Sequence, residues 1–194
     1  MILAKLKEAT REQHEALENV VDVMNSTFSM DDYGALLEKF YRYYLAIEPA
    51  LPAGELLSNG FDVESRRKLP SLERDLAVLG LLHEAQKENG PRPEIPVFDG
   101  PAKAFGTVYV LEGATLGGQI ISRHLSTHLG ITPENGGSFF YGYGPATGPM
   151  WKDFGAVITA YAESNGHENE MIEGAKETFE SFRTFFEASR QTKH

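Results

Sequence analysis

The sequence contains no cysteine, and this absence excludes several kinds of site at once. Disulfides, thiolate metal sites, iron–sulfur clusters, thioether-linked cofactors and cysteine nucleophiles all require a thiol. Any metal must therefore be bound by His, Asp, Glu, Tyr or Met side chains. The lack of thiols does not by itself fix the cellular compartment.

An excess of basic residues and long apolar runs are also missing. The chain has 18 Lys and Arg against 28 Asp and Glu, a net charge of −10, which argues against nucleic acid as a partner. No basic run favours a membrane surface, and no apolar stretch reaches the length of a membrane span. The N-terminus lacks the apolar core of a signal peptide. These features predict a cytoplasmic protein without a membrane partner.

The residues that are present predict an all-α fold, organised as a single domain over residues 1–194. Apolar residues recur at helical spacing, and the β-branched alternation typical of strands is missing. We expect Pro49 and Pro52 to end the second helix, Pro70 to interrupt the third, and Ser71 to cap its second piece. The expected helices span residues 2–20, 31–48, 64–82, 101–129, 149–163 and 168–190, with loops at 89–101 and 130–149.

The expected helix 101–129 contains an unusual number of glycines. Gly113, Gly117 and Gly118 lie within six residues, and each costs a helix about 1 kcal/mol relative to alanine. At 100° per residue, Gly106, Gly113 and Gly117 share one face. A face without side chains lets either a flat ligand or another helix approach the main chain, and the pattern alone leaves both explanations open.

Histidine is the best candidate for a metal ligand. His14 lies at the edge of the apolar stripe of the first helix, with Glu18 one turn later and Lys7 on the same flank. This position suits either a hydrogen-bonded structural histidine or an axial iron ligand whose ring Glu18 orients. His124 and His128 have the i, i+4 spacing of a metal pair, but no acidic residue lies within a turn of them.

The remaining polar residues give weaker signals. Glu177 and Glu180 resemble half of a di-iron motif, but no histidine follows at the required spacing. The glycine-rich segment lacks the Gly-Lys-Ser/Thr ending of a phosphate loop. Neither a flavin nor a nicotinamide motif is present.

Several segments, in order along nearly the whole chain, are similar to the haem oxygenases. The first resembles the motif of that family's proximal helix, and the fourth resembles its distal helix, which is kinked at its glycines. The matching segments are Leu6–His14 (LKEATREQH), Tyr41–Glu48 (YRYYLAIE), Leu72–Ala77 (LERDLA), Tyr109–Gln119 (YVLEGATLGGQ) and Ala175–Phe179 (AKETF).

The resemblance implies a b-type haem between the N-terminal helix and the 101–129 helix. His14 would be the proximal iron ligand, and Glu18 would support it. Gly113, Gly117 and Gly118 would form the distal floor over the ring. The other implied haem contacts are Lys7 and Lys152 at the propionates, Phe179 in the pocket wall, and Tyr109.

The chain departs from the family pattern at three positions. Ala114 stands where mammalian-type members have an aspartate that anchors distal water. Ala156 replaces a common arginine, and Val108 falls at a tyrosine used near the propionates, with Tyr109 one place away. The first departure concerns proton delivery, and the other two concern haem orientation and hence the carbon that is cut.

The resemblance implies oxidative cleavage of haem to biliverdin, CO and Fe²⁺ with O₂. Electrons would come from a separate ferredoxin or reductase, which would dock on a basic patch that includes Lys7, Arg11, Arg123 and Lys152. The alternatives are a haem carrier or sensor that does not turn over its ligand, and a helical oxidoreductase with two non-haem metals.

Overall fold

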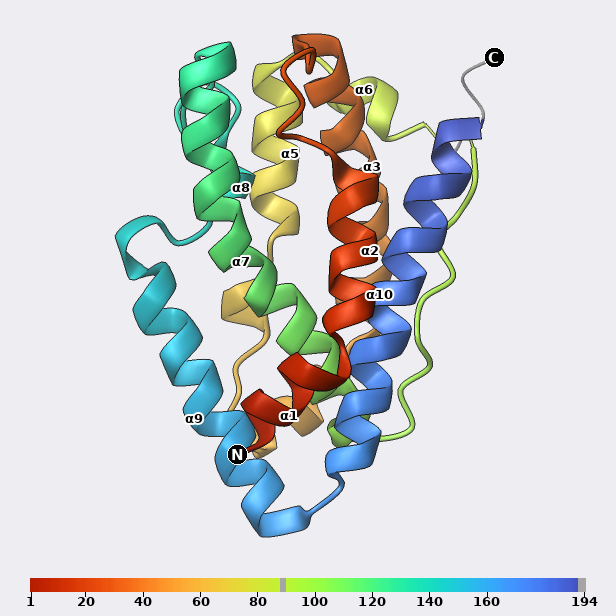
Figure 1. Ribbon diagram of the computed structural model, residues 1–194, viewed down its shortest axis with the longest axis vertical. Helices are drawn as coiled ribbons and strands as arrows, with labels where there is room; N and C mark the ends of the chain where they lie inside the picture. Colours follow the sequence, from red (N-terminus) through yellow and green to blue (C-terminus); the bar gives the residue numbers. More distant parts are fainter. Residues whose placement is uncertain (88–89, 192–194) are drawn as a thin grey trace.

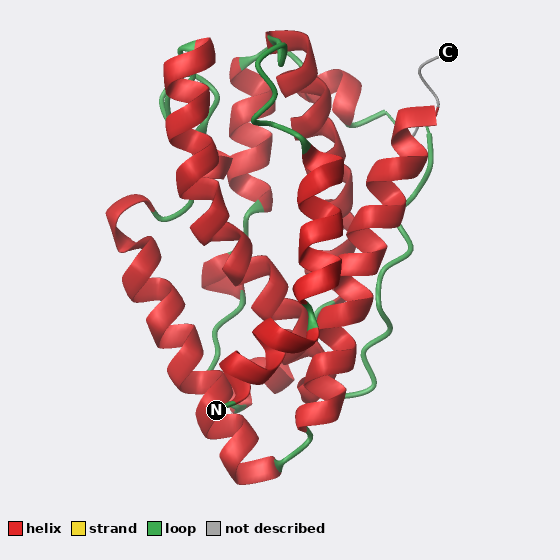
Figure 2. Cartoon of the chain, viewed as in Figure 1, coloured by secondary structure: helices red, strands yellow, loops and turns green. Residues whose placement is uncertain are grey.

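The computed structural model describes residues 1–87 and 90–191, and every regular element in these ranges is a helix (Figure 2). His194 lies outside the described residues. The predicted all-α fold is confirmed. The elements are α1 (Ile2–Ala9), α2 (Arg11–Val21), α3 (Met30–Ala50), α4 (Ala53–Ser58), the 3₁₀ turn η1 (Glu64–Arg66), α5 (Leu69–Val78), α6 (Leu82–Ala85), α7 (Pro101–Leu129), α8 (Ser138–Tyr141), the 3₁₀ turn η2 (Gly144–Ala146), α9 (Thr147–Asn165) and α10 (Glu168–Gln191).

The long glycine-bearing helix has the bounds predicted from the sequence. It begins at Pro101, whose missing N–H costs nothing in a first turn, and it ends before Gly130, which adopts a left-handed conformation with φ of 69°. Its two halves run in visibly different directions in Figure 1, where α7 crosses the molecule diagonally before turning upward.

Three of the expected boundaries were wrong. The predicted helix 2–20 is divided into α1 and α2 at Thr10, whose backbone leaves helical geometry and whose hydroxyl donates to the Leu6 carbonyl at 2.7 Å. The predicted helix 64–82 is reduced to η1, α5 and α6, and Ser71 lies inside α5 rather than at its start. Pro49 lies within the last turn of α3, which ends one residue later.

The segment 130–149, predicted to be a loop with aromatic residues, contains α8 and η2 and contributes to the core. Phe139 and Phe140 pack against Phe40 of α3, with ring centroids 5.0 and 5.6 Å apart. Phe186 of α10 approaches the same ring at 5.0 Å. These aromatic contacts join α3, α8 and α10.

Glycine allows a close crossing of α7 and α10. An added Cβ at Gly106 of α7 would overlap the carbonyl oxygen of Met171, and one at Gly174 of α10 would overlap that of Lys103. The hydroxyls of Thr107 and Thr178 meet at 2.8 Å in the same crossing. Helix α10 therefore lies against the N-terminal half of α7, and it also packs along α2 (Figure 1).

Candidate functional site

His14 lies on α2 with its side chain 55% exposed. Its Nε2 is 3.6 Å from Oε1 of Glu18. This distance is longer than a hydrogen bond, but it is short enough for the carboxylate to influence the orientation of the imidazole. On its other side, the imidazole meets the buried ring of Phe179 from α10 edge to face, with centroids 5.6 Å apart. The structure therefore brings His14, Glu18 and Phe179 together, and it leaves the imidazole accessible.

The glycines of α7 fall into two groups. Gly106 and Gly118 are required by packing, because an added Cβ at Gly118 would come 2.7 Å from the carbonyl oxygen of Phe140. By contrast, an added Cβ at Gly117 would meet open space. At Gly113 it would come 3.6 Å from the Trp151 ring, an ordinary van der Waals contact. The described protein therefore explains the glycines at 106 and 118 but not those at 113 and 117.

The face of α7 that carries these two glycines is directed toward α2. Tyr109, at one end of the face, is hydrogen-bonded to Thr10, immediately before α2, and burial raises the pKa of this phenol. At the other end, Nε2 of His128 donates to the carbonyl of Phe28, in the loop after α2, at 3.0 Å. Because α7 is tied to the chain on both sides of α2, Gly113 and Gly117 lie between the two ties and opposite α2.

The same face is apolar and exposed. Leu116 and Ile120 lie within about 100° of arc of Gly113 and Gly117, and their side chains are 40% and 56% exposed. Trp151 of α9, whose ring lies 5.7 Å from that of Tyr109, forms a wall beside Gly113. An exposed apolar face opposite an accessible imidazole is the arrangement expected for a flat apolar ligand.

Two exposed lysines flank this region. Lys7 lies in the last turn of α1, and Lys152 follows Trp151 on α9. Ala114 is exposed and supplies no acidic group next to Gly113. Among the described residues, no group of three or more His, Asp or Glu side chains could hold a metal ion. His124 and His128 stack at 5.3 Å, and the Phe28 carbonyl occupies Nε2 of His128.

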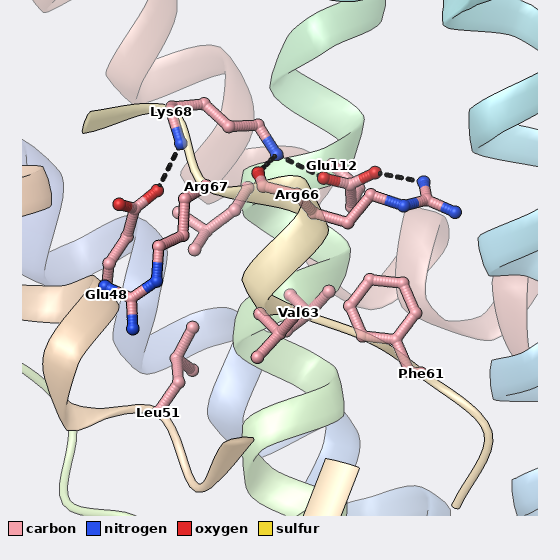
Figure 3. A pocket seen from close by; sticks show the side chains of 10 residues that line it. Glu48, Leu51, Phe61, Val63, Arg66, Arg67, Lys68 and Glu112 are labelled. Atoms are coloured by element: carbon pink, nitrogen blue, oxygen red, sulfur yellow. Dashed lines mark hydrogen bonds and ion pairs between the residues drawn. The ribbon is translucent and has the colours of Figure 1, made fainter. Parts of the chain in front are cut away.

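A buried charged cluster, which the sequence did not predict, lies behind Gly113. Glu112 is 1% exposed, and its carboxylate accepts from NH1 of Arg66 at 2.9 Å, from the Tyr143 hydroxyl at 2.8 Å and from Nζ of Lys68. Burial lowers the pKa of Lys68. Figure 3 shows Arg66 and Lys68 converging on Glu112.

Comparisons with known proteins give one consistent result. The family model described as "Heme oxygenase" matches residues 1–188. The chain belongs to the haem oxygenase family. A heme oxygenase of Xanthomonas campestris is 29% identical over 155 residues, covering 79% of this chain and 88% of the relative. The family resemblance predicted from the sequence is therefore confirmed, and the chain is an oxidoreductase that degrades haem.

Solved structures of haem oxygenases share the fold. The enzyme from Neisseria meningitidis, described in its NO- and CO-bound forms, superimposes with a TM-score of 0.82 at 23% identity, covering 97% of this chain and 92% of that one. Heme oxygenase 2 from Chlamydomonas reinhardtii without heme gives 0.70 at 18% identity, with 96% of each chain covered. The Leptospira interrogans structure gives 0.69 at 18% identity, covering 95% and 98%.

The residues between α2 and α7 fit haem as a substrate. A planar ring that carries iron calls for an accessible ligand atom on one face and room for close approach on the other. His14 provides an accessible nitrogen, and Gly113 and Gly117 provide backbone without side chains. Gly118 has a different cause, since Phe140 requires it. In the described ranges, no helix is long and apolar enough to cross a membrane.

The sequence analysis did not predict the buried acidic residues, although the sequence contains a weak indication of them. Glu48 and Glu112 both occupy core-facing positions of apolar helices, where an ionised side chain is rare unless it is paired. The sequence shows that a partner is needed, but it does not say which of the 18 basic residues supplies it. Arg66 and Lys68 lie more than 40 residues from Glu112 along the chain.

Proposed function

We propose that the substrate is a b-type haem, bound between α2 and α7 with its iron on His14. The observation that carries the proposal is the pair of glycines at 113 and 117, which the protein's own packing does not require. They lie on a face tied to both ends of α2, and α2 carries the accessible imidazole. A ring between the two helices accounts for the lost helix propensity at both positions.

In this proposal each residue around the imidazole has a defined task. Nε2 or Nδ1 of His14 binds iron as a neutral imidazole, and a nitrogen ligand pushes less electron density than a thiolate does. Oε1 of Glu18, one turn later, lies 3.6 Å from Nε2 of His14, and we expect this carboxylate to accept from the ring nitrogen that does not bind iron and so to fix the ring's orientation. Phe179 supports the imidazole edge from α10 and excludes water behind it.

The outer edge of the pocket is where we place the propionates. Lys7 on α1 and Lys152 on α9 have exposed ammonium groups, and each can donate a charge-assisted hydrogen bond to a propionate carboxylate. Tyr109 is fixed by Thr10 and Trp151, so its half-buried ring forms the wall between the two lysine-bearing helices. In this proposal, haem binding therefore uses residues from five helices, α1, α2, α7, α9 and α10.

Bound haem supplies the iron at which O₂ is activated, and the products we expect are biliverdin, CO and Fe²⁺. The protein contributes the shape and polarity of the distal side. The backbone at Gly113 and Gly117 allows only a narrow space above the ring, which directs O₂ sideways toward a carbon of the ring edge. Backbone amides and carbonyls there hold ordered water in place of an acidic side chain, because Ala114 provides none.

The electrons come, in this proposal, from a separate protein such as a ferredoxin or a reductase. Support comes from the sequence, which has no flavin or nicotinamide motif. Lys7, Arg11, Arg123 and Lys152 are exposed, and we expect their positive charges to attract an acidic donor despite the net charge of −10. The cytoplasmic location and the single-domain organisation stay predictions from the sequence.

The decisive experiment is haem titration followed by turnover in air with ascorbate or a ferredoxin system. We expect uptake of one haem and replacement of the Soret band by a bilin band. His14→Ala should weaken haem binding and lower turnover by about 100-fold or more, with partial rescue by added imidazole. His83→Ala, an exposed histidine on α6, is the control and should behave like the wild type.

Three results would contradict this proposal. They are failure of the wild type to take up haem, an unchanged Soret spectrum in His14→Ala, and a Soret band that persists through reduction in air. The last result would identify a carrier with the same fold. Product chromatography separates the biliverdin isomers and measures CO and iron release in the same samples.

A further inference from the structure

We propose that Arg66 is a positioning residue that sets the in-plane orientation of the haem, and thereby the carbon at which the ring is opened. The inference rests on the proposed binding of haem between α2 and α7. Arg66 lies in η1, far from His14 in the sequence, and its side chain is 13% exposed. Neither Gly113 nor any predicted haem contact is bonded to it directly.

One guanidinium nitrogen joins two walls of the pocket. NH1 of Arg66 donates to Oε2 of Glu112 on α7 at 2.9 Å and to the carbonyl oxygen of Met150 on α9 at 3.1 Å. Glu112 directly precedes Gly113, and Met150 directly precedes Trp151 and Lys152. The two bonds therefore fix the separation between the glycine floor on α7 and the start of the wall on α9.

The guanidinium is itself held in place from several sides. Its central carbon lies 5.3 Å from the ring centroid of Phe61 and 5.8 Å from that of Tyr143. Figure 3 shows Arg66 extending past Phe61 to reach Glu112. A planar cation stacked in this way loses little freedom when it forms both bonds, which makes it a rigid spacer rather than a loose surface pair.

The spacing matters because two haem contacts depend on different helices. Gly113 lies over the ring, and Lys152 holds a propionate at its edge. If the start of α9 moves relative to α7, the propionate held by Lys152 moves with α9, while the backbone at Gly113 does not move. The haem then rotates in its plane, and a different carbon of the ring edge lies nearest to the bound O₂. A displacement of about 1 Å changes reactivity by up to about 100-fold in an enzyme site.

Removing Arg66 leaves the buried carboxylate with partners. Glu112 keeps Lys68 and Tyr143, so Arg66→Met does not strand a buried charge. The methionine replaces the guanidinium beside the Phe61 ring with an apolar group. The matched control is Arg67→Met, the same substitution one residue later, where the guanidinium pairs with Glu64 of its own turn at 2.6 Å.

The test compares the two variants with the wild type in haem-free and haem-bound protein. In the haem-free protein, hydrogen exchange at residues 151–154, among the first hydrogen-bonded amides of α9, should accelerate about fivefold in Arg66→Met, as expected for the loss of one charged hydrogen bond. In the ferric cyanide complex, the pattern of haem methyl NMR shifts should change. The ratio of biliverdin isomers should change by about fivefold or more. Arg67→Met should match the wild type in all three readouts.

The inference is overturned if Arg66→Met keeps the wild-type isomer ratio and methyl shift pattern. It is also overturned if Arg67→Met changes them equally, since loss of a surface charge would then be the cause. Should Arg66→Met fail to fold, Arg66→Gln is read by the same criteria. A wild type that takes up no haem overturns the proposed function and this inference together, whereas unchanged isomers in a wild-type-like haem complex overturn the inference alone.

Discussion

A glycine in the middle of a long helix costs stability, and a neighbour that needs the space can offset that cost. In α7 the neighbour is α10 at Gly106 and the Phe140 backbone at Gly118. At Gly117 no part of the described protein fills the space that a Cβ would take. The proposed haem would fill this space, and haem is the substrate of the family to which the chain belongs.

Gly117→Ala should separate stability from function. The haem-free variant should be more stable by about 1 kcal/mol, because alanine has the higher helix propensity and meets open space. Haem should bind at least about fivefold more weakly, because the new methyl group overlaps the ring. Urea unfolding measures the first effect and haem titration the second.

Gly118→Ala is the matched control, because the same methyl group is added one residue later. There it comes 2.7 Å from the Phe140 carbonyl, so the haem-free protein should lose about 1–3 kcal/mol of stability. A Gly117→Ala variant that binds haem like the wild type would contradict the proposed floor.

The sequence identifies the site residues unevenly. His14 and the α7 glycines stand out because their local pattern conflicts with the helix around them. The sequence does not show that Gly117 and Gly118 have different roles. That difference depends on where Phe140, more than 20 residues later, passes α7. Thr10 is equally hidden, because its bond to Tyr109 requires the two helices to meet.

At the scale of elements, a neighbouring helix caps the start of α5. The carboxylate of Glu48, on α3, accepts from the backbone N–H of Lys68 at 2.6 Å and from that of Leu69 at 3.3 Å. Ser71, the cap expected from the sequence, lies inside the helix instead. A local capping rule could not find this arrangement, because the capping residue lies 20 positions earlier on another helix.

Glu48→Gln should change the pH dependence of the unfolding free energy, because it replaces the titratable group of this buried cap. Burial raises the pKa of Glu48 above its ordinary value of 4.5. Between pH 4.5 and the folded-state pKa, the folded chain therefore binds a proton that the unfolded chain has released. The stability that this carboxyl contributes is complete below pH 4.5 and is lost as pH rises through the folded-state pKa. Glutamine does not titrate, so the stability of the variant relative to the wild type should increase with pH.

Urea unfolding of both proteins at about pH 5 and about pH 8 measures this difference, and the subtraction removes the exposed carboxylates that titrate in both. Lys87→Gln, which removes an exposed charge paired with Glu84 on the surface, is the control and should give a flat difference. A stability difference between Glu48→Gln and the wild type that falls with rising pH would contradict the assignment.

At the scale of the whole molecule, the site depends on contacts that helical periodicity alone does not predict. The order and type of the main helices follow from periodicity, and α7 has its predicted bounds. The proposed haem site depends on α10 lying against both α2 and α7, and on the Tyr109–Thr10 and His128–Phe28 bonds at its two ends. The sequence predicted a haem site between these helices only through its resemblance to the haem oxygenases, and the helical pattern alone did not predict it.

This architecture predicts that haem stabilises the entire fold. A ligand that binds only the folded chain adds RT ln(1 + [L]/Kd) to its stability, about 2.7 kcal/mol at a concentration 100 times Kd. For a chain of 194 residues this corresponds to a rise in Tm of roughly 5 to 10 °C. The rise should grow with the logarithm of haem concentration, and calorimetry of the wild type over a series of haem concentrations measures it.

His14→Ala provides the comparison, because His14 is exposed and its removal should hardly change the haem-free Tm. At equal haem concentration its Tm should rise much less than that of the wild type. An equal rise would mean that haem is held elsewhere on the molecule or without iron ligation. A rise that is absent in both proteins would mean that the open face between Tyr109 and His128 is not a haem site, because burying Leu116, Ile120 and the ring together must favour the folded chain.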